Sequence, residues 1–83
     1  MKEFIEFIAK NLVDKPEAVR VEEILESDNR VKYILEVDDN ETGKVIGKMG
    51  RTAKAIRTLL SAVASKQGKR ALMEIPDKLK KEN

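Results

Sequence analysis

The chain has 83 residues, of which 41% are hydrophobic, and its 17 basic and 15 acidic residues leave a net charge of +2. This length supports one small domain, and the apolar content suffices for a packed core, which argues against general disorder. The absence of cysteine excludes disulfides and thiolate metal sites, and the absence of histidine removes the commonest general base. No apolar run has membrane-spanning length and the N-terminus is unlike a signal peptide, so we expect a cytoplasmic, non-enzymatic protein without metal or cofactor.

The charges are unevenly distributed along the chain. Eight basic residues and no acidic residue lie between Thr42 and Met73, so the other nine basic residues share the rest of the chain with all 15 acidic ones. This segregation predicts a positive face on an acidic body, which is typical of proteins that bind a polyanion. A solvated basic helix is the alternative interpretation, and the glycine-containing segment described below favours the binding face.

The first part of the chain is predicted to form a helix and then a strand. Apolar residues at helical spacing (Phe4, Ile5, Ile8 and Leu12) predict a helix that ends near Val13, ahead of Pro16. Apolar residues between Val19 and Leu25 predict a strand, with a change of phase at Glu22-Glu23 that suggests a bulge.

A turn at residues 27–30 leads into the clearest strand of the chain, in which apolar residues alternate from Val31 to Val37. The acidic stretch from Asp38 to Glu41 ends this strand and can cap a short helix over Thr42 to Ile46. The acidic residues could hold a metal ion. Because the chain lacks cysteine, histidine and EF-hand spacing, we interpret them as a solvated turn.

A long helix is predicted to begin at Arg51 or Thr52 and to end at Gly68. Its expected inward stripe consists of Ala53, Ile56, Leu60, Val63 and Ala64. Alternation from Ala71 to Ile75 predicts a last strand, and we expect residues 77–83 to form a charged, frayed tail. The order of elements predicts a single α+β domain over residues 1–76, with helices on one face of a three-stranded sheet.

The segment from Gly43 to Arg51 is the most informative part of the sequence. Gly47 and Gly50 flank Lys48-Met49, between an apolar pair and the long helix. A turn without Cβ atoms at its two ends lets another backbone approach closely, and amides at the start of a helix favour an anion. We therefore predict a phosphate-gripping loop. The spacing does not fit a nucleotide-binding glycine motif, and Lys48 is followed by Met49 where a P-loop needs Ser or Thr.

Val45-Ile46-Gly47-Lys48-Met49-Gly50, followed by Ile56, resembles the core of the KH domain, whose signature is Val-Ile-Gly-x-x-Gly-x-x-Ile-x-x-Ile. Ala53 occupies the first isoleucine position after the second glycine. The predicted order of elements is similar to the type II KH topology, α-β-β-α-α-β with a three-stranded mixed sheet. As a whole the chain resembles the small single-KH RNA-binding proteins of bacteria, the KhpA type.

The resemblance implies that the chain grips short single-stranded RNA as an RNA chaperone or post-transcriptional regulator. The two glycines would admit the RNA backbone, and the two residues between them would form the loop tip. Val45, Ile46 and the strand at residues 31–37 would supply an apolar floor for about four bases. The residues expected to contact RNA are Lys44, Val45, Ile46, Gly47, Lys48, Met49, Gly50, Arg51, Lys54 and Arg57.

The alternative function is that of a structural adaptor that uses the KH scaffold to pair with another protein. Base stacking contributes about 1–3 kcal/mol per base, yet the chain has only two phenylalanines and one tyrosine. Tyr33 could stack on a base, but its alternation with Leu35 and Val37 favours a place in the core.

Self-association is predicted from the long helix. Leu59 lies off the inward stripe, flanked by Ala55 and Ala62, so that a twofold pairing of this helix with its copy would place Leu59 near the axis. The competing interpretation is that Leu59 extends the core of one chain. The resemblance also implies a heterodimer with a larger Jag-type KH protein (KhpB), for which the same patch could serve.

Overall fold

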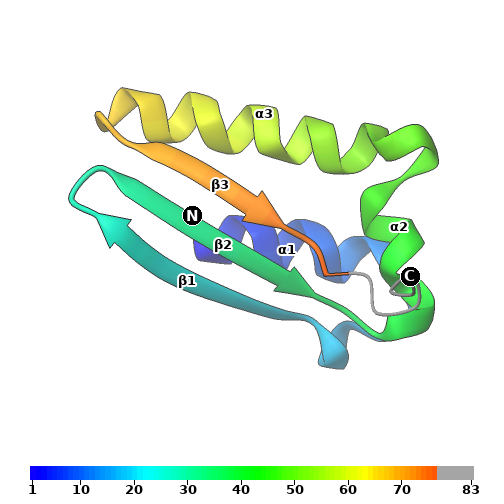
Figure 1. The fold of residues 1–83 in the computed structure, drawn as a ribbon. Helices are drawn as coiled ribbons and strands as arrows, with labels where there is room; N and C mark the ends of the chain where they lie inside the picture. Colours follow the sequence, from blue (N-terminus) through cyan, green and yellow to red (C-terminus); the bar gives the residue numbers. More distant parts are fainter. Residues whose placement is uncertain (77–83) are drawn as a thin grey trace, which may run out of the picture.

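The computed structural model describes residues 1–76, and the tail predicted at residues 77–83 lies outside the described residues. The helices and strands are α1 (Lys2–Leu12), β1 (Arg20–Ser27), β2 (Arg30–Glu36), α2 (Thr42–Ile46), α3 (Arg51–Lys66) and β3 (Arg70–Glu74) (Figure 1). Their order and the mixed sheet confirm the predicted α+β class and the topology that the KH resemblance implied. No helix within residues 1–76 is long and apolar enough to cross a membrane.

The three strands form one sheet in the order β1-β2-β3. β1 pairs antiparallel with β2 through a tight turn, and Val21 stands opposite Leu35. β2 pairs parallel with β3, with Val31 opposite Ala71. Because parallel strands need a crossover connection, the chain between β2 and β3 passes through α2 and α3 before it returns to the sheet. Figure 1 shows α3 lying alongside β3.

The core lies between one face of the sheet and the three helices. Alternate residues of the strands point to this face, and they are buried against residues of α1, α2 and α3. The core consists of Ile5, Ala9, Val13, Val21, Val31, Tyr33, Leu35, Val45, Ile56, Leu60, Ala64, Ala71 and Met73. Tyr33 is buried, and its hydroxyl donates a hydrogen bond to Glu23 Oε2 at 2.9 Å, which confirms the core interpretation of this side chain.

The helix α1 ends where the sequence predicts, because Val13 turns to an extended backbone ahead of Pro16. The side that it buries includes Ala9, which was not among the apolar residues that predicted this helix. Ile5 and Ala9 are buried, whereas Phe4 and Leu12 are partly exposed at the flanks. The buried face of α1 is therefore centred on Ile5 and Ala9.

The helix α3 buries Ala53, Ile56, Leu60 and Ala64, as predicted. The prediction for Val63 was wrong, because this side chain is 42% exposed on the flank of the stripe. After α3, Gly68 adopts a φ of +72°, and the backbone N–H of Lys69 donates to the carbonyl of Ala64 at 2.8 Å, which closes the end of the helix.

The bulge in β1 is also displaced from its predicted position. The register shifts between Leu25 and Ser27, next to the turn, and Glu22 and Glu23 keep the regular alternation. Glu23 stands on the covered face opposite Tyr33 at the edge of the sheet, where its carboxylate accepts the phenol hydroxyl. Because Glu23 is charged, it interrupts the apolar alternation of β1, and the sequence therefore suggested a bulge where the strand is regular.

Candidate nucleic-acid interface

The turn between α2 and α3 has an unusual backbone. Gly47 ends α2 by donating its N–H to the carbonyl of Gly43 at 2.8 Å, and it adopts a φ of +81°. Met49 and Gly50 also have positive φ, at 58° and 76°, and the Gly50 N–H donates to the Gly47 carbonyl at 3.0 Å. Three of the four residues in this turn thus lie where ordinary side chains are unfavourable. We call residues 47–50 the glycine loop.

The two glycines of the loop are needed for different reasons. A Cβ atom on Gly47 would lie 2.6 Å from the Cβ and 2.8 Å from the backbone nitrogen of Thr52, which no real packing allows. A Cβ atom on Gly50 would meet nothing within 4 Å, so that only its positive φ favours glycine there. The chain therefore passes over the start of α3 in direct contact with it.

The glycine loop presents cationic and apolar side chains to solvent. Met49 at its tip is 86% exposed, and Lys48, Arg51 and Lys54 are exposed around it. The first turn of α3 contains no acidic residue, and its N-cap, Gly50, offers no side chain to the free N–H groups. Exposed amides at a helix start attract anions through hydrogen bonds and the helix dipole. The structure therefore brings the predicted loop cations to one end of α3.

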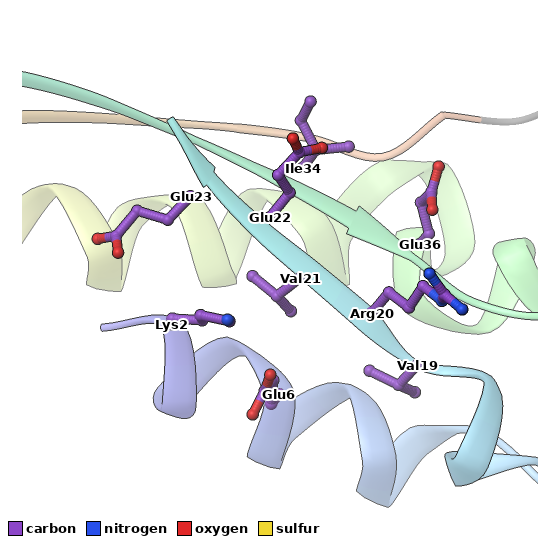
Figure 2. A pocket seen from close by; sticks show the side chains of 9 residues that line it. All are labelled: Lys2, Glu6, Val19, Arg20, Val21, Glu22, Glu23, Ile34 and Glu36. Atoms are coloured by element: carbon purple, nitrogen blue, oxygen red, sulfur yellow. The ribbon is translucent and has the colours of Figure 1, made fainter. Parts of the chain in front are cut away.

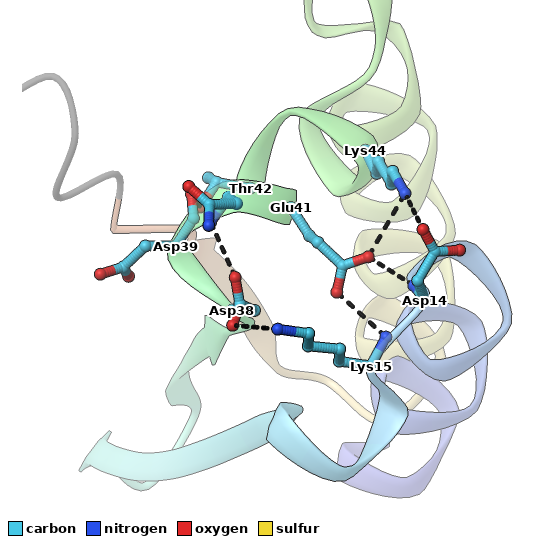
Figure 3. Close-up of polar contacts among 8 residues, drawn as sticks. Asp14, Lys15, Asp38, Asp39, Glu41, Thr42 and Lys44 are labelled. Atoms are coloured by element: carbon cyan, nitrogen blue, oxygen red, sulfur yellow. Dashed lines mark hydrogen bonds and ion pairs between the residues drawn. The ribbon is translucent and has the colours of Figure 1, made fainter.

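Two of the predicted contact residues are directed elsewhere. Lys44 Nζ lies 2.7 Å from Asp14 Oδ2 and 3.3 Å from Glu41 Oε2 (Figure 3). Hydrogen bonds to these carboxylates raise the pKa of Lys44, and the hydrogen bond from Lys44 lowers the pKa of Asp14. Lys44 thus serves an ion-pair network. Val45 is fully buried in the core and has no surface to offer to a base, which leaves Ile46, half-buried, as the apolar residue beside the loop.

Glu41 is a structural residue that the sequence interpretation missed. It is only 6% exposed, and its carboxylate accepts the backbone N–H groups of Asp14 at 2.5 Å and Lys15 at 3.0 Å (Figure 3). The prediction of a solvated acidic turn was therefore wrong for Glu41, although Asp39 is exposed. Within residues 1–76, no group of acidic side chains is arranged to hold a metal ion.

The inward side chains of the strand that was predicted to supply the apolar floor belong to the core. Val31, Tyr33 and Leu35 of β2 are buried beneath the helices, and none of them lines the hollow beside α3. The strand beside α3 is β3, and Arg57 Nε donates to the carbonyl of Met73 at 3.1 Å. A hollow of about 320 Å³ lies between α3 and β3, and we call it the base groove. It is lined by Arg57, Leu60, Ser61, Ala71, Leu72, Met73 and Glu74.

Another hollow, about 650 Å³, lies beside α1 and β1, and no residue of the glycine loop lines it. In Figure 2, Glu6 and Val21 lie between α1 and β1, whereas Ile34 and Glu36 lie on the other side of β1, so the hollow wraps around the open edge of the sheet. Four glutamates and only two basic residues line it. This excess of negative charge disfavours a phosphate-bearing ligand at this edge.

The order of elements, the parallel pairing of β2 with β3 and the glycine loop before α3 together define a KH-type domain. A model of the KH domain of KhpA and KhpB matches residues 2–75. The chain is 52% identical over 75 residues to the RNA-binding protein KhpA of Chlamydia trachomatis, and the alignment covers 90% of this chain and 95% of the relative. The chain therefore belongs to the KhpA/KhpB family of KH domains.

Other relatives are similar to the same extent. The RNA-binding protein KhpA of Clostridium perfringens is 52% identical over 75 residues, which are 90% of this chain and 99% of the relative. The protein of the same name from Aquifex aeolicus is 51% identical over 75 residues, 90% of this chain and 94% of the relative. These proteins are named for RNA binding and not for an enzymatic activity, in agreement with the expectation that the chain is not an enzyme. No solved structure gives a significant match.

Proposed function

We propose that this protein binds short single-stranded RNA, with a phosphate on the glycine loop and bases in the base groove. The observation that carries the proposal is the loop itself, in which three left-handed residues hold uncapped helix amides beside exposed Lys48 and Arg51. The names of the relatives described above support RNA as the ligand. Single strands are expected because a groove of this kind takes splayed bases, which a duplex hides.

The residues fall into three roles in this proposal. Gly50, which faces open space, allows the close approach of the RNA backbone, Gly47 lets the loop pack against Thr52, and Lys48 and Met49 lie at the tip. Arg51 and Lys54 supply positive charge along the first turns of α3. Ile46 and Arg57 border the bases, and Arg57 is held in place by its hydrogen bond to β3. In the cell, such a binder would act as an RNA chaperone or post-transcriptional regulator.

The double substitution Lys48→Asp with Met49→Asp tests the proposal. It places two negative charges where a phosphate must lie, so the affinity for single-stranded RNA should fall by about tenfold or more. Because both side chains are exposed, the melting temperature should hardly change. Fluorescence anisotropy with a labelled single-stranded RNA and circular dichroism measure the two quantities.

Lys10→Asp with Asn11→Asp is a matched control, because it changes the net charge equally at two exposed positions of α1. The control should bind RNA as the wild type does. A loop variant that retains the wild-type affinity would exclude the glycine loop as the RNA site.

A second proposed role, pairing with another KH protein, is favoured by an exposed apolar patch on α3. Leu59 is 50% exposed and Val63 is 42% exposed, and the exposed alanines Ala55 and Ala62 lie beside Leu59. Leu59 therefore does not belong to the core of the single chain, and a large apolar side chain among small ones suits close helix packing. We propose a homodimer, or a heterodimer with a Jag-type protein (KhpB), on this patch; the adaptor function would use the same surface.

A further inference from the structure

A series of hollows continues from the base groove toward the far end of α3. The next hollow, about 370 Å³, shares Ser61 and Ala71 with the base groove. A third hollow, about 310 Å³, shares Lys69 and Arg70 with the second. Because neighbouring hollows share lining residues, they follow one another along α3 and the start of β3.

The far part of this series has a basic lining, and we call it the basic edge. Its side chains and backbone come from the β1–β2 turn, the end of α3 and the start of β3. The basic edge consists of Asn29, Arg30, Ser65, Gly68, Lys69 and Arg70. No acidic residue lines it, although the base groove itself ends at Glu74 on the other side.

The cations of the basic edge differ in how far they are already neutralised. Arg30 is paired with Glu26 at 3.1 Å. Among the described residues, no ion pair engages Lys69 or Arg70, and both side chains are exposed. The Arg70 backbone N–H donates to the carbonyl of Asn29 at 2.8 Å, which fixes the start of β3 against the β1–β2 turn. Lys69 and Arg70 thus carry positive charges that no described acidic residue neutralises, at a position where a hydrogen bond holds the backbone.

The basic edge and the glycine loop lie at opposite ends of α3. At 1.5 Å per residue, the 16 residues of this helix span about 24 Å. Lysines at a helix C-terminus complement the helix dipole, which gives a structural reason for Lys69. The dipole does not account for Arg70, which begins β3, or for the series of hollows between these cations and the base groove.

We propose that the basic edge is a second phosphate-binding zone, which a single strand reaches after it leaves the base groove. The inference rests on the proposed RNA-binding function and extends it: the footprint is longer than the about four nucleotides that one KH groove clamps. The backbone phosphates contact Lys69 and Arg70, and Ser61 and Ser65 line the path of the strand.

The test compares labelled oligouridylates of about four and about twelve nucleotides on the full chain. The variant Lys69→Gln with Arg70→Gln should bind the longer RNA about fivefold more weakly and the shorter RNA as the wild type does. Two lost contacts should also reduce the slope of log K against log salt by about 1.4, because each single-strand contact contributes about 0.7. Ser65→Glu, which adds negative charge without touching β3, should weaken only the longer RNA as well.

Lys10→Gln with Arg20→Gln is the matched control, since it removes one lysine and one arginine from exposed positions elsewhere. It should leave both affinities unchanged. The proposal is overturned if Lys69→Gln with Arg70→Gln behaves like this control, or if it weakens both lengths equally. A wild type that binds neither length would overturn the proposed function together with the basic edge, whereas a wild type that binds both lengths equally would overturn the basic edge alone.

Discussion

The carboxylate of Glu41 accepts the backbone N–H of Lys15 at 3.0 Å, although 26 residues separate the two in the chain. Its second oxygen accepts the N–H of Asp14 and lies 3.3 Å from Lys44 Nζ. One buried side chain thus joins the segment after α1 to the start of α2. Since α2 leads directly into the glycine loop, this carboxylate fixes the entry to the candidate RNA site.

Glu41→Ala should lower the free energy of unfolding by about 3 kcal/mol, because it leaves two N–H groups and the Lys44 cation without their acceptor. Glu41→Gln keeps one acceptor oxygen and should lose about half as much. Urea denaturation measures both values. Asp39→Ala, at an exposed neighbouring position, is the control and should stay within about 0.5 kcal/mol of the wild type. Equal effects at Asp39 and Glu41 would contradict the buried network.

Three glycines of this region should respond differently to alanine. Gly47→Ala combines a positive φ with a clash against Thr52, so we expect a loss of about 2–3 kcal/mol. Gly50→Ala has a positive φ but open space, and about 1 kcal/mol is expected. Gly43→Ala lies within α2 with nothing nearby and should be neutral or slightly stabilising. Thermal unfolding of the three variants gives their order of stability. A Gly43→Ala variant that is less stable than Gly47→Ala would refute the predicted order.

Leu59→Arg should separate association from folding. If the exposed patch is a twofold interface, both protomers place the new charge near the axis and the two charges repel each other. Sedimentation should then show a folded monomer, and its helicity should be close to that of the wild type. Thr58→Arg, at an exposed position one residue away, should leave the association state unchanged. An unfolded Leu59 variant would contradict the surface position of this side chain, and a wild type that stays monomeric at high micromolar concentration would refute self-association.

Tyr33 provides a test at high pH, because it is the only tyrosine and the chain has no tryptophan. Burial, followed by the hydrogen bond to Glu23, raises the pKa of Tyr33 to about 12 in the folded chain. The unfolded value is about 10, so the fold favours the neutral phenol. The resulting stability is complete below pH 10 and is lost as the pH rises toward 12.

The absorbance of tyrosinate should therefore titrate near pH 12 in the folded chain and near pH 10 in urea. Lysines also titrate in this range, so the stability of Tyr33→Phe serves as the reference. Its free energy of unfolding should fall less steeply above pH 10 than that of the wild type. A folded-state midpoint at pH 10 would contradict the buried hydrogen bond.

Much of the fold could be predicted because its elements have strong local signals. The alternation of β2, the stop of α1 before Pro16 and the start of α2 after the acidic stretch all agree with the structure. The spacing of apolar residues correctly predicted which side of α3 is buried. The buried face is narrower than the spacing suggested, so Val63 was wrongly predicted to point inward. Glu23 was misinterpreted because its inward position on β1 is explained by the hydrogen bond from Tyr33 of the partner strand, which local sequence does not reveal.

The candidate site could be predicted only where it is local. The glycine loop and its exposed cations follow from adjacent residues. The roles of Lys44 and Val45 depend on Asp14 and on the core, which come from distant parts of the chain. The wall of the base groove could not be assigned either, because the sequence does not tell which strand α3 lies against. These are tertiary contacts, and a single sequence does not encode them in any short pattern.

The parallel pairing of β2 with β3 has a consequence for the order of events during synthesis. The glycine loop lies within the crossover between these strands, whereas the base groove needs β3 as its second wall. A ribosome that has released the chain only as far as α3 therefore exposes the loop and its cations without a groove. Non-local parallel contacts of this kind form late. A nascent chain thus completes the base groove only after residue 74 has emerged and joined the sheet.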